Sequence, residues 1–380
     1  MTAEPEPVQK PRVLFLTRKW RPAVGGMETY SEQLVEHLEQ TCQLETRVLP
    51  GRADGRPPSI LSLLAFTIRC AFSLLRSKGQ FEIVHGADMA IWPLVLVARL
   101  RSPRARLFLS AHGSDVSLAY RDGWAANAYR LYLGAAKRLL PGVKVIANSR
   151  ATADLAVGLG FRQCHVTKLA AGCSADWRDA RYPPKETSPN ILFVGRLLGH
   201  KGCGWFIKHV LEELPSEIRL KVAGTGVDPS ETTALDHPRV DYLGAVYGEA
   251  LARARRAALA VIVPNIDTGM PGFEGFGLVA TEAAGDGAVT LAADLHGLRD
   301  ALIDGETGFL LPPGDPAAWR DKILDVAAWS PKQREDFVDR ASRVTRDIYN
   351  WQRVASRTKA LYAEAIGSRD RASENRIKLA

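Results

Sequence analysis

Two glutamates frame the stretch of the chain whose residue types could do chemistry. Glu274 lies in a loop rich in Gly and Pro, and Glu282 follows inside a helix that we predict over residues 276–284. About six helical residues lead from the helix start to Glu282, roughly 9 Å along the axis at about 1.5 Å per residue. A diphosphate with a sugar attached has that reach. One carboxylate could therefore serve the reacting end of such a donor while the other holds its far end.

The backbone between the two glutamates is suited to a ligand. Gly275 and Gly277 allow the chain to bend and a ligand to approach the main chain closely. The helix N-terminus, with Phe276 and Leu278, offers unpaired N–H groups and a positive dipole end, which favour a phosphate or an electron-rich sugar oxygen. A strand–loop–helix unit with solvated glutamates is the alternative, and it would be preferred for Glu282 alone. The stretch as a whole favours the ligand site.

Two cations follow the strand predicted over residues 190–196. Arg196 and Lys201 lie five positions apart across a glycine-containing loop. Converging there, they would neutralise a diphosphate well, because both present N–H donors with positive charge. A surface charge pair is the alternative interpretation.

The first half of the chain contributes a second set of candidates. Gly25 and Gly26 stand at a strand-to-helix turn, where they could cradle a phosphate or simply make a tight turn. His112 and Asp115 follow the strand predicted over residues 107–111, and ligands of doubly wound sheets bind at the carboxyl ends of strands. We assign His112 to positioning and electrostatics, since nothing in the spacing makes it a nucleophile or a base. Asp115 could orient it or cap the next helix.

The string E-G-F-G-L-x-x-x-E-A, which begins at Glu274, resembles the signature of the retaining GT-B glycosyltransferases of family 4, with their glycogen-synthase-like donor domain. Two stretches depart from that pattern. Residues 171–174 read Ala-Gly-Cys-Ser instead of Asn-Gly-Val-Asp, and residues 285–289 lack the usual proline. Four further motifs are similar to those of the family: G-G-x-E from Gly25, H-G-x-D from His112, G-R-L-x-x-x-K-G from Gly195 and G-x-G from Gly224.

The resemblance implies a role for each matching residue. Glu274 would bind the donor sugar, Glu282 the nucleotide ribose, and His112 would support the transition state near the sugar. Arg196 and Lys201 would hold the diphosphate. Retention of configuration is implied too, and because the sequence contains no Asp-x-Asp we expect neither a metal nor a cofactor. The other implied contacts are donor-side Gly25, Gly26, Gly195, Gly224, Gly226, Gly275, Phe276, Gly277 and Leu278, and acceptor-side Glu28 and Asp115.

The elements that position these residues alternate between strand and helix, which favours an α/β fold. We predict two Rossmann-like doubly wound parallel-sheet domains facing across a cleft, the GT-B architecture. Core packing is the favoured explanation for an apolar helix over residues 59–75. The predicted order is a disordered start over 1–11, an acceptor-side domain over 12–181, a linker over 182–189, a nucleotide-sugar domain over 190–345, a helix over 336–366 that returns to the first domain from residue 346, and a disordered tail over 367–380.

Composition agrees with two globular domains. The chain has 380 residues, of which 46% are hydrophobic and 24% charged. No apolar run reaches the ~18 residues of a membrane span, and the first residues lack a signal-peptide core. We therefore expect a cytoplasmic protein. Five scattered cysteines without a C-x-x-C indicate neither a disulfide framework nor a zinc site.

The net positive charge comes entirely from the first half of the chain. Residues 1–180 contain 24 Lys and Arg against 15 Asp and Glu, whereas the remainder has 26 against 27. Such a field favours an anionic partner: phosphorylated small molecules, an acidic membrane surface or nucleic acid. Nucleic acid is not expected, because no recognition motif accompanies the charge. The helices over 59–75 and 120–140 combine apolar and basic residues, so the inner face of the cytoplasmic membrane is a candidate partner.

The predicted function is retaining transfer of a hexose-like sugar from a UDP- or GDP-sugar to a glycan or lipid-linked acceptor, in cell-surface polysaccharide, lipopolysaccharide or glycolipid synthesis. A dinucleotide oxidoreductase is excluded, because no G-x-G-x-x-G follows the first strand of either domain. Two alternatives stay open. One is an epimerase or phosphorylase on the same scaffold, and the other is a non-catalytic protein that binds membrane or glycan.

Overall fold

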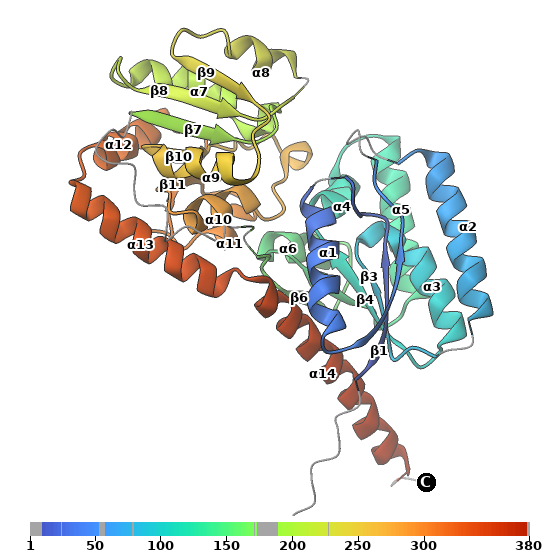
Figure 1. Ribbon diagram of the computed structural model, residues 1–380. Coiled ribbons are helices and arrows are strands. Elements are labelled where there is room, and N and C mark those ends of the chain that lie inside the picture. The colour runs from blue at the N-terminus through green and yellow to red at the C-terminus, as the bar shows by residue number, and fades with distance from the viewer. Residues whose placement is uncertain are drawn as a thin grey trace, which may run out of the picture. The chain divides into compact units, whose positions relative to one another are not determined.

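The structure, a computed structural model, describes residues 10–23, 25–52, 58–77, 80–170, 172, 189–226 and 228–377. Several predicted features lie outside these residues: residues 1–9 and 378–380, the linker up to residue 188, and the departures at Ala171, Cys173 and Ser174. The chain divides into two compact units (Figure 1). Unit 1 comprises Met1–Asn148, Thr152–Thr167 and Trp351–Ala380, and unit 2 comprises Ser149–Ala151 and Lys168–Asn350.

Unit 1 is built on a six-stranded parallel sheet with the order β2-β1-β3-β4-β5-β6. Its inner strands are short and almost wholly apolar, because a parallel sheet covered by helices is buried on both faces. The pairing of β1 with β3 places Val13 opposite Ile83. The strands are β1 (Arg12–Thr17), β2 (Gln43–Val48), β3 (Ile83–Gly86), β4 (Arg106–Ala111), β5 (Lys144–Ala147) and β6 (Cys164–Val166).

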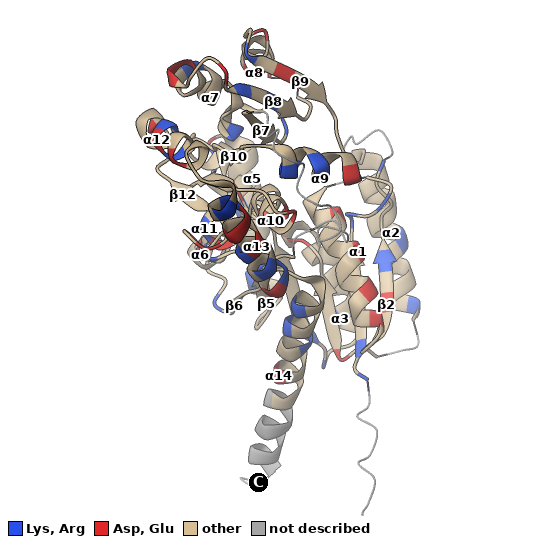
Figure 2. Cartoon of the chain, turned by 60° about the vertical axis from the view of Figure 1, so that its left-hand side comes forward, with Lys and Arg blue, Asp and Glu red and all other residues tan. Residues whose placement is uncertain are grey.

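Helices cover both faces of this sheet, α1 with α14 on one face and α2, α3 and α5 on the other (Figure 1). The charged residues of α1 are all acidic, whereas those of α2 are all basic (Figure 2). The helices of unit 1 are α1 (Gly26–Glu39), α2 (Ile60–Arg76), α3 (Trp92–Arg101), α4 (Ser114–Ser117), α5 (Trp124–Leu139), α6 (Arg150–Gly158, which begins in unit 2) and α14 (Trp351–Ile377), with 3-10 turns η1 (Met89–Ile91) and η2 (Leu118–Tyr120).

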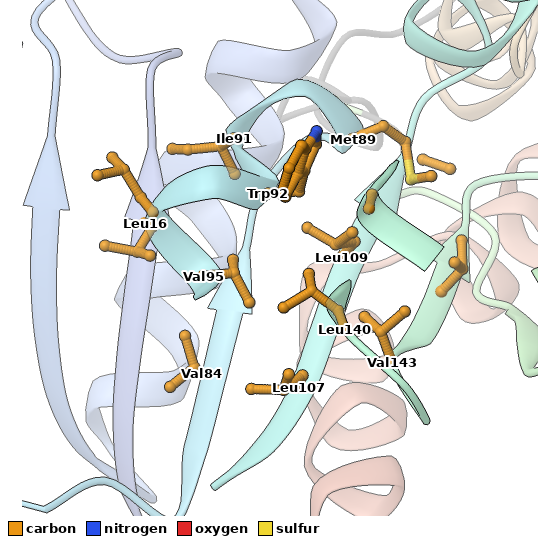
Figure 3. Close-up of a cluster of buried hydrophobic side chains, with 14 of the residues drawn as sticks. Leu16, Val84, Met89, Ile91, Trp92, Val95, Leu107, Leu109, Leu140 and Val143 are labelled. Atoms are coloured by element: carbon orange, nitrogen blue, oxygen red, sulfur yellow. The ribbon is translucent and has the colours of Figure 1, made fainter. Parts of the chain in front are cut away.

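The core of unit 1 lies between the sheet and the layer of α2, α3 and α5. Trp92 at the start of α3 lies against this core with Leu109 of β4 and Val95 nearby (Figure 3). Leu16 and Val84 of the neighbouring strands extend the same cluster. This packing fixes the carboxyl ends of β1, β3 and β4, from which the candidate residues of unit 1 emerge.

Unit 2 repeats the architecture with a second six-stranded parallel sheet in the order β12-β11-β10-β7-β8-β9. Its central pair, β10 and β7, places Ile262 opposite Phe193. The strands are β7 (Asn190–Val194), β8 (Arg219–Ala223), β9 (Val240–Gly244), β10 (Ala260–Val263), β11 (Thr290–Ala293) and β12 (Phe309–Leu311). Both units are therefore doubly wound, and the predicted fold class is confirmed.

The helices of unit 2 include α10, which carries Glu282 and packs against α13. Among the described residues no helix is both long and apolar enough to span a membrane. The helices are α7 (Cys203–His209), α8 (Pro229–Ala234), α9 (Gly248–Ala257), α10 (Leu278–Gly285), α11 (Leu298–Ala301), α12 (Pro316–Ala327) and α13 (Pro331–Ile348), with 3-10 turns η3 (Gly199–Lys201), η4 (Leu211–Glu213) and η5 (Met270–Gly272).

The C-terminal part differs from the single helix expected over residues 336–366. It forms two helices, α13 and α14, because Tyr349 leaves helical geometry at φ −107° and ψ 70°. The Tyr349 hydroxyl donates to the Asp300 carbonyl at 2.7 Å, and Asn350 Nδ2 donates to the last carbonyls of α13 at Arg346 and Asp347. The chain passes back to unit 1 at Trp351. Helix α14 then continues to Ile377. The tail that was expected to be disordered is therefore helical up to that residue, because it contains no proline that would end the helix.

Candidate functional site

Lys201 and Glu274 form an ion pair in unit 2, between the loop after β7 and the loop after β10. Both side chains are mostly buried, with 21% and 15% of their surface exposed. Gly202 makes the approach possible: it has φ +75°, and a Cβ there would lie 2.0 Å from the Pro264 carbonyl oxygen. A side chain at this position would hold the two loops apart and separate the ion pair.

The environment of Glu274 keeps the carboxylate charged. Burial alone would raise its pKa, but Lys201 and Asn265, whose Nδ2 donates at 3.3 Å, outweigh burial and hold the Glu274 pKa below its ordinary value. Glu274 is thus a fixed anion beside a fixed cation. Such a pair can accept hydrogen bonds from sugar hydroxyls and donate to a phosphate.

Glu282 lies on α10 in a different charged group. Arg255 of α9 donates from its two terminal nitrogens to Glu282 at 2.7 Å and to Asp286 at 2.8 Å. Asp286 and Arg255 are almost fully buried, whereas the Glu282 side chain keeps 25% of its surface exposed. Burial raises the pKa of Glu282 above its ordinary value even though Arg255 opposes this. Glu282 is therefore the accessible end of a buried triad.

The N-terminus of α10 lies between these two groups in the sequence. The helix begins at Leu278, two positions later than expected, because Gly277 has φ +97°. Phe276 is buried and its ring lies 6.0 Å from that of Tyr349. The Gly275 carbonyl lies so close to Gly297 that a Cβ at Gly297 would be 2.3 Å from it.

The other predicted glycines of unit 2 bring two strand ends together. A Cβ at Gly224, after β8, would lie 1.8 Å from the carbonyl oxygen of Gly195, after β7. A Cβ at Gly226 would likewise lie 2.3 Å from the Leu197 carbonyl. These contacts leave no room for side chains and place both turns at the carboxyl edge of the sheet, where nucleotides bind in such folds.

Arg196 and Lys201 occupy different environments. Lys201 is held by Glu274, whereas Arg196 is exposed. Within the ranges that the structure describes, no ion pair joins Arg196 to a carboxylate. Arg196 thus keeps its guanidinium available to an anion.

His296, which follows β11 at the same edge, was not predicted from the sequence. It is a non-glycine residue with positive φ, +47°, and its ring lies 4.6 Å from that of Phe273. Its buried Nδ1 has no hydrogen-bond partner among the described residues. Burial lowers the His296 pKa, although Asp267 and Glu274 oppose this. The available signal was a histidine followed by Gly at the end of a buried strand.

Arg255 and Asp286 were also missed. Arg255 belongs to α9, and Asp286 caps the C-terminal end of α10. In the sequence both resemble ordinary charged residues on a helix surface. Gly172 belongs to a stretch that departs from the family pattern at its other three positions, and a Cβ there would lie 3.3 Å from Glu282 Oε1. The structure therefore brings this glycine to the triad.

In unit 1, Asp115 fixes the loop that carries His112. Its two oxygens accept hydrogen bonds from the backbone N–H groups of His112 at 2.8 Å and Met89 at 3.1 Å. Burial raises the Asp115 pKa. His112 Nε2 donates to the Ala87 carbonyl at 2.8 Å, and its ring packs edge-on against Tyr30 at 4.6 Å. Asp115 is thus a positioning residue for the loop that carries His112.

A second charged pair, Arg18 with Asp88, adjoins this loop and was not predicted. Arg18 Nε donates to both Asp88 oxygens at 3.0 and 2.9 Å. Asp88 is fully buried, and 28% of the Arg18 side chain is exposed. Both residues follow strand ends, after β1 and β3.

The side chain of Glu28 holds the glycine turn before α1. Gly25 caps α1 and Gly26 is its first residue. Glu28 folds back toward Gly25, where a Cβ would lie 2.6 Å from its Oε2, and pairs with Lys19 at 3.4 Å. Glu28 therefore stabilises the turn.

The residues brought together are thus Lys201 with Glu274, Glu282 with Arg255, and His112 with Asp115. Among the described residues no group of three or more His, Cys, Asp or Glu could hold a metal ion. The described cysteines, Cys42, Cys70, Cys164 and Cys203, are free thiols.

Comparison with known proteins adds relatives in sequence and fold. The chain is 31% identical over 191 residues to a D-inositol 3-phosphate glycosyltransferase of Corynebacterium efficiens, covering 46% of this chain and 42% of that protein. It is 25% identical over 372 residues to a GDP-mannose-dependent alpha-mannosyltransferase of Mycobacterium tuberculosis, covering 87% and 91%. The match to the first protein therefore spans less than half of that protein's length.

Similar solved structures support the fold. HepE of Anabaena in complex with UDP-glucose has a TM-score of 0.69 and 16% identity, covering 94% of this chain and all of HepE. Residues 24–172 match the family described as Glycosyltransferase Family 4, and residues 188–328 match Glycosyl transferases group 1. Two matched halves on two doubly wound units show that the chain belongs to the GT-B glycosyltransferases of the family 4 and group 1 type.

Proposed function

We propose that the protein transfers a hexose-like sugar from a nucleotide diphosphate sugar to a glycan or lipid-linked acceptor, with retention of configuration. The Lys201–Glu274 ion pair carries this proposal. It places a cation beside a carboxylate. In a nucleotide sugar the phosphate adjoins the sugar hydroxyls, so the cation can bind the phosphate while the carboxylate accepts hydrogen bonds from the hydroxyls. Exposed Arg196 supplies a second cation for the leaving diphosphate.

The leaving group accounts for most of the chemistry that the protein must supply. A nucleoside diphosphate departs with negative charge, so fixed cations and helix N–H groups that strengthen their contacts as the bond breaks lower the barrier. We assign these contacts to Lys201, which Glu274 holds in place, to the exposed Arg196 and to the N-terminus of α10. We propose that these protein cations stabilise the charge without a metal, and that Glu274 orients the sugar through its hydroxyls.

Glu282 suits the other end of the donor. Its carboxylate is held by Arg255 and partly exposed, so it can accept hydrogen bonds from the two hydroxyls of a ribose. HepE, a neighbour in fold, binds UDP-glucose, and the mycobacterial relative is named for GDP-mannose. These names support a UDP- or GDP-sugar as the donor.

We assign the acceptor to unit 1, through His112 and the loop that Asp115 fixes. The helices α2, α3 and α5, which we call the basic layer, support a membrane-held acceptor. They contain no acidic residue, and their seven charged residues are Arg69, Arg76, Arg99, Arg101, Arg130, Lys137 and Arg138.

The basic layer also exposes large apolar side chains. Only one side of α2 packs in the core as expected, through Phe66, Cys70 and Leu74. Apolar residues beside cations suit the surface of an anionic bilayer. We propose peripheral binding to such a membrane for glycolipid or cell-surface polysaccharide synthesis. The exposed apolar residues of the layer include Ile60, Leu61, Leu64, Ile68, Phe72, Leu75, Leu100, Trp124, Leu131 and Leu139, each at least half exposed.

Thermal unfolding with UDP, GDP, ADP and their sugar conjugates tests the donor site. A ligand at about 100 times its dissociation constant stabilises by roughly 2.7 kcal/mol, which raises the melting temperature measurably. We expect one nucleotide to stabilise the wild type and to lose most of this effect in Arg196→Ala, Glu282→Ala and Arg255→Met. Lys208→Met, an exposed change on α7, is the control. Failure of every nucleotide to shift the wild type would refute the proposal.

A further inference from the structure

A groove of about 670 Å³ runs between α2 and α5 in unit 1. This volume is within the range of ligand-binding sites in proteins, about 300–1,000 Å³. Of the described residues that line it, Arg18 alone is charged. The apolar and aromatic lining includes Leu64 and Phe66 of α2, Pro93 of α3, and Trp124, Ala128 and Tyr132 of α5.

The hydroxyl groups in this lining already donate to backbone carbonyls. Thr67 donates to Leu63 at 2.8 Å, Tyr129 to Asp115 at 2.8 Å, and Tyr132 to Ala90 at 2.6 Å. Apart from Arg18 and the indole N–H of Trp124 at the exposed rim, no described lining side chain therefore has a free donor for a polar ligand. A sugar or a nucleotide would lose its hydrogen bonds to water here, which disfavours both.

The groove begins at the ligand-binding edge of the unit 1 sheet. Arg18 follows β1, and the turn η1 and Pro93 follow β3, so this end of the groove lies at the carboxyl ends of the strands. Asp115, which accepts hydrogen bonds from the His112 backbone, also has its carbonyl bonded to the groove residue Tyr129. The groove and the proposed acceptor loop are therefore adjacent.

The groove also continues onto the exposed surface of the basic layer. Leu64 lines it and is 53% exposed, and Trp124 at its rim is 84% exposed. An apolar channel that joins a cationic, apolar surface fits a hydrocarbon chain whose source is an anionic bilayer.

We infer that the α2–α5 groove holds the hydrocarbon chain of a phosphate-bearing acceptor lipid, with the phosphate at Arg18. The inference rests on the proposed function, because it places that acceptor beside the His112 loop. Arg18 uses only Nε for Asp88, so among the described residues its terminal amino groups are available to the phosphate. The pairing with Asp88 holds the guanidinium in place.

Photo-crosslinking tests the groove. The probe is hexadecyl phosphate with a diazirine at the end of its chain, carried in vesicles of phosphatidylglycerol and phosphatidylcholine. In the wild type we expect labelled peptides from residues 63–67 and 124–132. Ala128→Trp fills the groove and should reduce this labelling at least tenfold. The matched control is Ala65→Trp, an exposed change on α2 outside the groove lining, which should label as the wild type does.

The Arg18 contact is tested by replacing the phosphate of the probe with a hydroxyl. The wild type should label several times better with the phosphate, and Arg18→Gln should lose this preference. Labelling of Ala128→Trp within twofold of the wild type, or no preference for the phosphate in the wild type, would overturn the inference.

Nucleotide binding separates the inference from the proposed function. Ala128→Trp should keep the nucleotide-induced rise in melting temperature, which also shows that it is folded. A retained rise with unchanged groove labelling overturns the inference alone. Groove labelling as expected in a wild type that binds no nucleotide would refute the proposed function and support the groove.

Discussion

The two units place their charged residues in opposite ways. In unit 2 the candidate carboxylates are buried and paired, Glu274 with Lys201 and Glu282 with Arg255. In unit 1 the basic layer has cations and no acids, and its cations lie among exposed apolar side chains. Paired, buried charges have fixed positions, so they suit recognition of a small polar ligand.

The exposed cations of the basic layer act differently. Exposed cations on flexible side chains attract an anionic surface over about a Debye length, near 8 Å at physiological salt, without defining one geometry. In the function that we propose, chemistry therefore belongs to unit 2 and placement at a membrane to unit 1. The acidic α1 lies on the other face of the same sheet, so the proposed membrane contact is confined to the face that carries the basic layer.

The largest expected effect comes from breaking the ion pair of unit 2. Lys201→Met removes the cation that keeps the Glu274 pKa low, and Glu274→Gln removes the anion. We expect each change to lower kcat by about 10²–10³, the usual cost of one fixed transition-state contact. Steady-state transfer assays measure this.

The same pair should show coupling in stability. Because Lys201→Met leaves a mostly buried carboxylate without its cation, the double variant Lys201→Met/Glu274→Gln should be more stable than Lys201→Met alone. Urea unfolding measures the difference, and Lys208→Met is the matched control. Transfer by Lys201→Met within twofold of the wild type would remove the ion pair from the mechanism.

A smaller effect is expected from placing an acid in the basic layer. Ile68 of α2 is 68% exposed and should enter the lipid surface. Ile68→Glu removes this apolar burial and adds a negative charge, which the anionic membrane repels. We expect binding to phosphatidylglycerol vesicles to weaken at least tenfold, with nucleotide binding unchanged. Vesicle co-sedimentation at low and high salt measures it.

The control for this variant lies in the other unit. Leu324→Glu makes the same kind of change on α12, where the side chain is 37% exposed. It should bind vesicles as the wild type does. Equal losses in the two variants, or salt-insensitive binding of the wild type, would contradict membrane docking through α2.

The sequence predicts the fold class well because most strands are short apolar runs between turn residues. It fails at β2, an edge strand whose Glu45 and Arg47 make it too polar to stand out. The sequence also predicts one helix in place of α13 and α14. The break at Tyr349 is stabilised by contacts with Asp300 and Phe276, which are distant in sequence.

The candidate site divides in the same way. Glu274, Lys201 and Arg196 are found by motif, since their spacing is local. Their partnerships are not, because the loop of Lys201 meets that of Glu274 through contacts between distant parts of the chain, among them the close approach at Gly202. The Arg255 triad and His296 depend on the side-by-side placement of helices and strand ends, which no local pattern records.

The smallest expected effect concerns a buried group of unit 1 that is neutral. His85 of β3 is fully buried, with Nδ1 2.6 Å from the Tyr362 hydroxyl and Nε2 2.8 Å from Ser110 Oγ. Burial lowers its pKa to about 3, with His112 adding to the effect. This hydrogen-bonded group joins α14 to the sheet, so its protonation would weaken the packing of the C-terminal helix.

The pH dependence of stability follows from that lowered pKa. The unfolded chain protonates His85 near pH 6.5, whereas the folded chain does so only near pH 3. Between these values the unfolded state binds more protons, so stability falls as the pH falls, by at most about 1.4 kcal/mol per pH unit. Between pH 6 and 5, where the unfolded chain protonates His85 and the folded chain does not, the stability of His85→Gln in urea unfolding should depend less steeply on pH than that of the wild type. An unchanged slope in His85→Gln would show that the buried histidine is not what acid disrupts.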